Sequence, residues 1–157
     1  MCLEKKFKEP FAANVIHWRP GSTNKDKTKC IALAYVDARD VMKRLDEAVG
    51  PENWRDSYEE FSSGRLICTL YIRIDGEWIG KSDGAGDSAI EGAKGGISDA
   101  LKRAAVRWGI GRYLYYLPVK WVEMNKYRQI ENPPALPSWA LPKNLTSEKK
   151  AELTGWQ

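Results

Sequence analysis

Between residues 54 and 81 apolar and polar side chains alternate, which is the period of β-strands. Two turns interrupt the alternation, one at Ser62-Ser63-Gly64 and one at Asp75-Gly76, a preferred two-residue hairpin turn. Every second residue of the central stretch is apolar, so one face of the resulting sheet is apolar. The sequence therefore predicts two or three antiparallel strands, at about 54–61, 66–74 and 77–81.

Helical periodicity flanks these strands on both sides. Asp37 can cap a helix that runs to about Val49 and stops at Gly50-Pro51. A longer helix is predicted over about Ser88–Trp108, because one apolar stripe recurs at steps of three and four and can cover the sheet. The stripe consists of Ile90, Ala93, Ile97, Leu101, Ala104 and Trp108. We therefore expect an α+β fold, in which a short β-β-β meander is packed by a long helix, with a preceding helix.

The other side of the long helix carries three glycines, Gly92, Gly95 and Gly96. Each costs about 1 kcal/mol relative to alanine in a helix interior. We expect a neighbouring protein chain or a phosphate backbone to approach the helix there. The glycines at 84–86 are expected to form a flexible turn between sheet and helix.

Length and composition describe one soluble globular domain: 157 residues, 43% of them hydrophobic and 29% charged. No run of about 18 apolar residues and no apolar signal core is present, so we expect a cytoplasmic protein without a membrane partner. From residue 130 onward prolines recur. We expect a core domain at 1–129 and a Pro-rich extended tail at 130–157 that docks in part.

Three cysteines, Cys2, Cys30 and Cys68, fit neither a disulfide framework nor paired metal knuckles, which indicates a reducing compartment. His17 is the single histidine, and we expect it to have a structural role rather than a catalytic one. We accordingly expect no metal, no cofactor and no catalytic residue, and hence no enzyme.

The net charge of +4 is unevenly distributed. Residues 101–128 hold seven basic side chains and one acidic side chain, a local charge of +6. Aromatic residues are interleaved with them, a mixture that suits phosphate attraction and base stacking, although the same rings could belong to the core or to a subunit interface. The rings are Trp108, Tyr113, Tyr115, Tyr116, Trp121 and Tyr127.

Three motifs that suggest enzymes are weak. Gly80-Lys81-Ser82 ends like a phosphate loop, but the upstream Gly76 leaves three intervening residues where four are needed. A dinucleotide-like glycine pattern at 84–89 has no βαβ unit around it. Asp83, Asp87 and Glu91 could be metal ligands of a nuclease, but acidic residues also complement the dipole of a helix N-terminus.

Residues 91–109 read EGAKGGISDALKRAAVRWG. This stretch resembles the Rad52 family of single-strand annealing proteins, whose signature is a lysine, a gap, Ser/Thr-Asp, a small residue, Leu-Lys-Arg-Ala, an aromatic residue and glycine. The helix from Asp37 to Gly50-Pro51, followed by Trp54, looks like the family's first core helix and the start of its sheet. Residues 107–115 look most like the branch that contains bacterial DdrA and phage annealing proteins. The resemblance covers about residues 30–118.

The resemblance implies ATP-independent binding of single-stranded DNA and annealing of complementary strands in recombinational DNA repair, by subunits assembled into a homo-oligomeric ring. Lys102 and Arg103 match the family's inner DNA site. Arg107 is offset by one residue from a family position at Val106, and Arg39 is offset by one from a position at Asp40. The full set of candidate DNA-binding residues is Lys102, Arg103, Arg107, Arg39, Lys94, Arg73, Lys81 and Arg112.

A lysine that some family members use in a second DNA site corresponds here to Ile74, so the resemblance does not extend to that site. It further implies a bacterial or phage-encoded, nucleoid-associated protein, whose tail can contact other repair or replication proteins. Two alternatives from other classes stay open. One is a double-stranded RNA-binding module, since helix, three strands and helix is also its order. The other is a metal-dependent nuclease.

Overall fold

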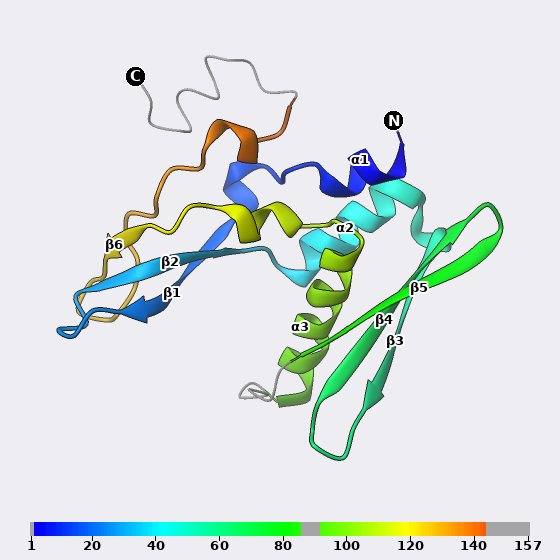
Figure 1. Ribbon diagram of the computed structural model, residues 1–157, viewed down its shortest axis with the longest axis horizontal. Helices are drawn as coiled ribbons and strands as arrows, with labels where there is room; N and C mark the ends of the chain where they lie inside the picture. The colour runs from blue at the N-terminus through cyan, green and yellow to red at the C-terminus, as the bar shows by residue number, and fades with distance from the viewer. Residues whose placement is uncertain (1, 86–91, 144–157) are drawn as a thin grey trace. The chain divides into compact units, whose positions relative to one another are not determined.

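The computed structural model describes residues 2–85 and 92–143, with side chains in the long helix described from Gly95 onward. The described residues form two compact units: the first unit holds residues 2–8 and 37–112, and the second holds 9–36 and 113–143. Together they contain three α-helices and two three-stranded antiparallel sheets, which confirms the α+β class. Figure 1 labels the elements.

The first unit contains the predicted meander with a helix on either side of it in the sequence. Its elements are α1 (Leu3–Lys8), α2 (Ala38–Val49), the 3-10 turn η2 (Pro51–Asn53), β3 (Trp54–Glu60), β4 (Leu66–Ile74), β5 (Glu77–Gly84) and α3 (Gly92–Arg107). The strand order is β3-β4-β5. Asp75 and Gly76 both have positive φ, at 51° and 83°, as the predicted hairpin turn requires.

Two predictions at the end of the sheet were wrong. Strand β5 continues to Gly84, three residues beyond its predicted end, because Ser82, Asp83 and Gly84 stay paired with β4. Gly84 is therefore a strand residue and not part of a flexible turn. The glycine at 86, the remainder of the predicted turn, lies outside the described residues.

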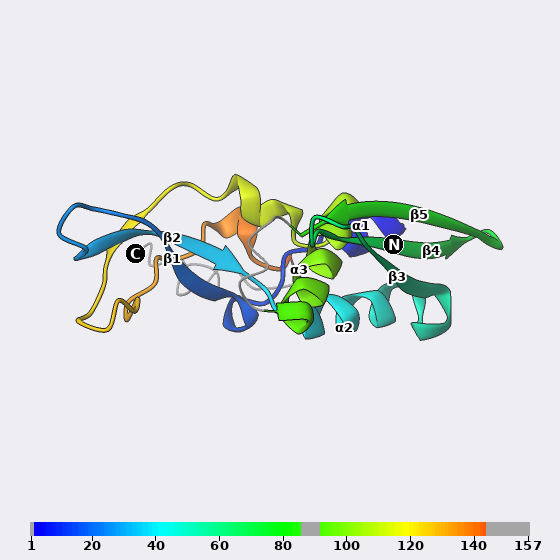
Figure 2. The ribbon, with the colours of Figure 1, turned by 90° about the horizontal axis from the view of Figure 1, so that it is seen from below.

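Helix α3 packs on the inner face of the sheet, and Figure 2 shows α2 on the same side. The inner face of β4 consists of Cys68, Leu70 and Ile72, all fully buried. The facing side chains of α3 are small apart from one leucine: Ala100, Leu101, Ala104 and Ala105.

One member of the predicted apolar stripe, Ile97, is not part of the core. Ile97 is 43% exposed, so its assignment to the core was wrong. Ile97 shares the helix face of Leu101 and Ala104 but lies one turn nearer the N-terminus of α3, where this face is not fully covered. Ile90 and the side chain of Ala93 lie outside the described residues.

Helix α2 begins and ends where the sequence predicted. Asp37 is its N-cap residue, and the helix stops at Gly50, whose φ of 88° suits glycine. Val41 and Leu45 are the buried side chains of its inner face.

Trp108 joins three parts of the first unit. Its indole Nε1 donates a hydrogen bond to the carbonyl oxygen of Leu70 over 3.0 Å, and its ring meets that of Phe7 edge-on at 6.1 Å. The Nζ of Lys81 lies 4.6 Å from the same ring. Trp108 therefore holds α1, the end of α3 and the sheet together.

The second unit contains a sheet of order β1-β2-β6, formed by β1 (His17–Thr23), β2 (Lys29–Tyr35) and β6 (Trp121–Glu123). The sequence predicts a short strand at Val119–Glu123, after Pro118, and β6 lies within it. Strands β1 and β2 were not predicted. Pro20 and Gly21 obscure β1 in the sequence, and the register of β1 shifts between Pro20 and Thr23. The ring of His17 lies 5.3 Å from that of Tyr35.

The Pro-rich segment as far as Lys143 belongs to the second unit, which also contains η1 (Ala13–Val15) and η4 (Ser138–Ala140). Three of its side chains, Leu136, Ala140 and Leu141, are buried. The predicted boundary between a core domain and a tail at residues 129–130 stays a prediction. No described helix has the length and apolar character needed to cross a membrane.

The buried thiol of Cys68 gives a pH-dependent prediction. Burial raises the pKa of this thiol from 9.0 to about 11, while Tyr58 acts in the opposite direction. The unfolded chain ionises the thiol first, so the free energy of unfolding should fall between about pH 9 and pH 11, by at most about 2–3 kcal/mol. Urea unfolding across this range measures the fall. Cys68→Ala should reduce this fall of the free energy of unfolding with pH, whereas Cys2→Ser, at an exposed thiol, should not. The same dependence on pH in the wild type and in both variants would contradict the prediction.

Trp108→Phe should lower the free energy of unfolding by about 1–3 kcal/mol, because the Leu70 carbonyl loses its indole donor while the aromatic ring is kept. Urea unfolding monitored by circular dichroism gives the value. Trp78→Phe, at a ring 37% exposed on the other face of the sheet, is the matched control and should cost less. A control that costs as much as Trp108→Phe would show that the hydrogen bond is unimportant.

Candidate nucleic-acid interface

Helix α3 and strand β5 bring two arginines to one carboxylate. Arg103 and Arg107 are four residues apart and so share one face of α3. Asp83 projects from β5: its Oδ1 lies 3.6 Å from Nε of Arg103, and its Oδ2 accepts a hydrogen bond from Nε of Arg107 over 3.3 Å. The packing of α3 against β5 thus gathers charges that are 20 or more residues apart in the sequence.

Lys81 joins this group from the same strand and the same side as Asp83. Its Nζ lies over the Trp108 ring and 3.5 Å from the carbonyl oxygen of Arg107. We call the group Lys81, Asp83, Arg103 and Arg107 the α3–β5 edge. Three of its side chains are cationic, and Arg103 and Arg107 are about half exposed, so an anion in solution can reach them.

Arg112 lies behind the α3–β5 edge, whereas Lys102 lies on a neighbouring face of α3. Lys102 precedes Arg103 on α3 and is half-buried. Arg112, at the start of the 3-10 turn η3 (Arg112–Tyr116), donates from Nε to the Val106 carbonyl over 3.0 Å and from Nη2 to the Arg107 carbonyl over 2.8 Å. Arg112 therefore caps the end of α3 and supports Arg107.

The other candidates are not gathered at this edge. Arg73 projects from the outer face of the sheet, where its Nε donates to Oδ1 of Asn53 over 2.8 Å. Arg39 is exposed in the first turn of α2. Lys94 is a residue of α3, but its side chain lies outside the described residues.

Sequence reasoning overlooked a cation–aromatic cluster on the outer face of the sheet. The guanidinium of Arg55 lies 4.8 Å from the ring centres of both Tyr71 and Trp78, and that of Arg73 lies 5.4 Å from Trp78. Tyr71 also crosses Gly80 so closely that a Cβ there would lie 2.8 Å from its ring. Strand parity was the available signal, since all these residues occupy outward positions of their strands.

Asp83 was assigned to a helix N-terminus, and this was wrong. The residue belongs to β5, and its partners are two guanidiniums, with the backbone N–H of Gly84 donating to Oδ1 over 2.8 Å. A carboxylate held in this way has few lone pairs left for a divalent ion. Asp87 and Glu91, the other two candidate ligands of a nuclease site, lie outside the described residues.

The basic segment 101–128 divides between the two units. Lys102, Arg103, Arg107 and Arg112 belong to the first, and Lys120, Lys126 and Arg128 to the second. Its rings also differ: Trp108 is part of the packing described above, whereas Tyr115, Tyr116, Trp121 and Tyr127 are between 53% and 73% exposed. These four rings are available for stacking or for a subunit contact.

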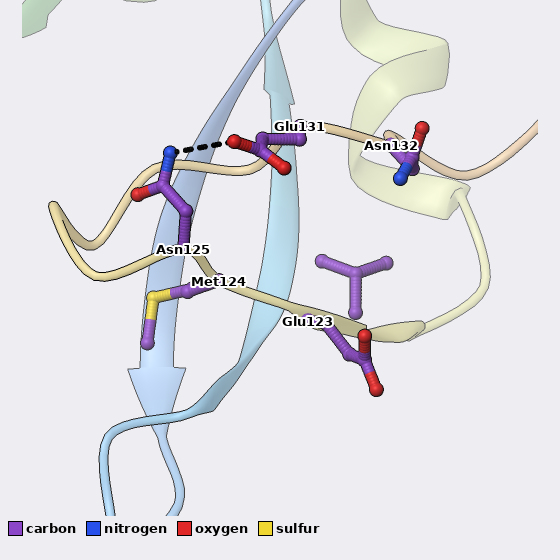
Figure 3. Close-up of a pocket in the computed structure, with 6 residues that line it drawn as sticks. Glu123, Met124, Asn125, Glu131 and Asn132 are labelled. Atoms are coloured by element: carbon purple, nitrogen blue, oxygen red, sulfur yellow. Dashed lines mark hydrogen bonds between the residues drawn. The ribbon is translucent and has the colours of Figure 1, made fainter.

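Figure 3 shows a hollow in the second unit, lined by Val122, Glu123, Met124, Asn125, Glu131 and Asn132. The amide of Asn125 donates to the Glu131 carboxylate over 3.1 Å, and its own oxygen accepts from the backbone N–H groups of Tyr127 and Gln129. Asn125 therefore shapes this loop. Two carboxylates among the lining residues make the hollow unsuitable for phosphate.

Gly96 bears on the expected approach of another chain. A Cβ at this position would lie 3.7 Å from Cδ2 of Leu66, an ordinary contact. The packing of the first unit therefore does not itself require this glycine. Approach by a neighbouring chain or a phosphate backbone stays a prediction.

Two kinds of comparison with known proteins place this chain. The sequence model of the Rad52/22 family, described as double-strand break repair proteins, matches residues 2–132. The single-stranded DNA-binding protein DdrA of Deinococcus deserti is 40% identical over 155 residues, which cover 96% of this chain and 76% of that protein. The protein of the same name from Deinococcus radiodurans is 39% identical over 144 residues, which cover 89% of this chain and 68% of that protein. The chain therefore belongs to the Rad52/22 family of double-strand break repair proteins.

Proposed function

We propose that the chain binds single-stranded DNA and anneals complementary strands in DNA repair, without nucleotide hydrolysis. The observation that carries the proposal is the α3–β5 edge, where Lys81, Arg103 and Arg107 present three cations on rigid elements. The relatives are named as single-stranded DNA-binding proteins, which supports the same ligand. We include Lys102, on the neighbouring face of α3, because it matches the family's DNA site, and Arg112 supports the α3–β5 edge.

Cations on a helix and a strand attract phosphates without reading bases. A scaffold that follows the phosphates leaves base edges free to meet a second strand, and pairing then supplies the free energy of annealing. No covalent step is needed, and we therefore propose a binding protein and not an enzyme. We propose that the protein acts in the bacterial cytoplasm, where it associates with DNA.

We further propose that the working form is a homo-oligomeric ring. One chain offers a short cationic edge, whereas single-strand sites usually cover many nucleotides. Repetition of the edge around a closed assembly would make it continuous. The exposed rings of the second unit, including Tyr115 and Trp121, are suited to a subunit contact or to base stacking, and the tail to contacts with other repair proteins.

The double-stranded RNA-binding alternative shares the element order of the first unit, α2-β3-β4-β5-α3. Family membership favours the single-strand function. Competition between labelled single-stranded DNA and unlabelled duplex RNA decides between them, and a preference for the duplex RNA would reverse the assignment.

Changing Lys102 and Arg103 together to alanine should lower affinity for single-stranded DNA at least about tenfold at low salt and abolish annealing. The slope of log affinity against log salt should become shallower by about 0.7 for each phosphate that the variant no longer binds. Fluorescence anisotropy with a labelled oligothymidine and an annealing assay with complementary oligonucleotides measure the two effects. The control variant, Lys5→Ala with Lys25→Ala, removes the same charge at exposed sites. Normal annealing by the Lys102/Arg103 variant would show that the site is wrong.

Native mass spectrometry should find one predominant assembly of many 17.8 kDa chains, with and without single-stranded DNA. The Lys102/Arg103 variant should form the same assembly, because the change affects only DNA binding. A monomer under both conditions would contradict the ring.

A further inference from the structure

The α3–β5 edge already contains an anion of its own. Asp83 gives one carboxylate oxygen to Arg103 and the other to Arg107. This is the arrangement that a bound phosphate group would adopt between two guanidiniums, since both anions offer separate oxygens to separate donors.

Asp83 is fixed in this position by the sheet. The residue lies opposite Cys68 in the β4–β5 pairing, and its Oδ1 also accepts the N–H of Gly84. Its side chain is 26% exposed, against 46% for Arg103 and 59% for Arg107. The carboxylate is thus the inner partner, and the guanidiniums extend past it toward solvent.

Both interactions use Nε, which carries one of the five N–H donors of each guanidinium. Among the described residues, the terminal nitrogens of Arg103 and Arg107 have no acceptor. A phosphate can therefore begin to bind these nitrogens from the solvent side while Asp83 still holds Nε.

The electrostatic effect of Asp83 on a bound strand is unfavourable. The guanidiniums of Arg103 and Arg107 alone carry a charge of +2, and these two together with the Asp83 carboxylate carry +1. A phosphate that enters also meets a like charge a few ångströms away, only partly screened at a half-buried site.

We propose that Asp83 is a built-in competitor for the phosphate backbone: it positions Arg103 and Arg107 and lowers their affinity for single-stranded DNA, so that strands can move and leave. This inference rests on the proposed function, because it needs the edge to bind a strand. Such competition suits annealing, because a strand that is bound too tightly can neither shift along the protein to find its complementary register nor dissociate as duplex DNA.

Asp83→Asn tests the proposal with little change in shape, because the amide oxygen can still accept the N–H of Gly84. We expect affinity for a labelled oligothymidine to rise about three- to tenfold at low salt, mainly through slower dissociation. Glu77→Gln is the matched control, since it removes the same charge from an exposed position of the same strand. In a background of Arg103→Ala with Arg107→Ala, Asp83→Asn should give no gain beyond that of the control.

A second readout needs no DNA. Phenylglyoxal modifies accessible arginines, and peptide mass spectrometry reports the rate at each site. Arg103 and Arg107 should react faster in Asp83→Asn than in Glu77→Gln, because guanidiniums no longer held by the carboxylate at Nε can turn more freely and present their terminal nitrogens, to which the reagent adds.

The outcomes separate this inference from the proposed function. Wild-type binding with no gain in Asp83→Asn over the control, or with weaker binding, would overturn the competitor role and leave the proposed function intact. No binding by the wild type would overturn the proposed function, and this inference with it.

Discussion

The close packing of α3 on the sheet is the constraint on which the rest of the first unit depends. Ala100, Ala104 and Ala105 are fully buried at this contact, and small side chains allow the helix axis to lie near the strands. Arginines on the flank of the helix can then reach β5. With larger side chains in place of the alanines, Arg103 and Arg107 would stand away from Asp83, and the α3–β5 edge would not form.

The α3–β5 edge attracts phosphates through three cations and weakens that attraction through one carboxylate. Lys81, Arg103 and Arg107 supply charge without any group that reads bases, which suits a ligand of arbitrary sequence. Asp83 offsets part of the charge and orders the guanidiniums. Arg112 and Trp108 lie behind the edge, one capping α3 and the other tying its end to Leu70. Binding and stability are therefore supported by neighbouring but different residues.

The first unit was largely predictable, because its signals are local. Alternation over 66–74, the Asp75-Gly76 turn and the Gly50-Pro51 stop each determine their own element. The second unit was harder: β1 contains Pro20 and Gly21, and β2 pairs with β6, about 90 residues away. At the site, Arg103 was found through a family signature. The role of Asp83 required the extension of β5 and its distance to α3, neither of which a linear pattern shows.

Protection of Arg103 and Arg107 by a bound strand is the most direct test that the α3–β5 edge binds single-stranded DNA. The protein is treated with phenylglyoxal with and without saturating oligothymidine, and modification is mapped by peptide mass spectrometry. We expect strong protection of Arg103 and Arg107, while exposed Arg19 in the second unit reacts as it does in the free protein. Unchanged reactivity of Arg103 and Arg107 in a protein that has demonstrably bound the strand would show that the strand binds elsewhere.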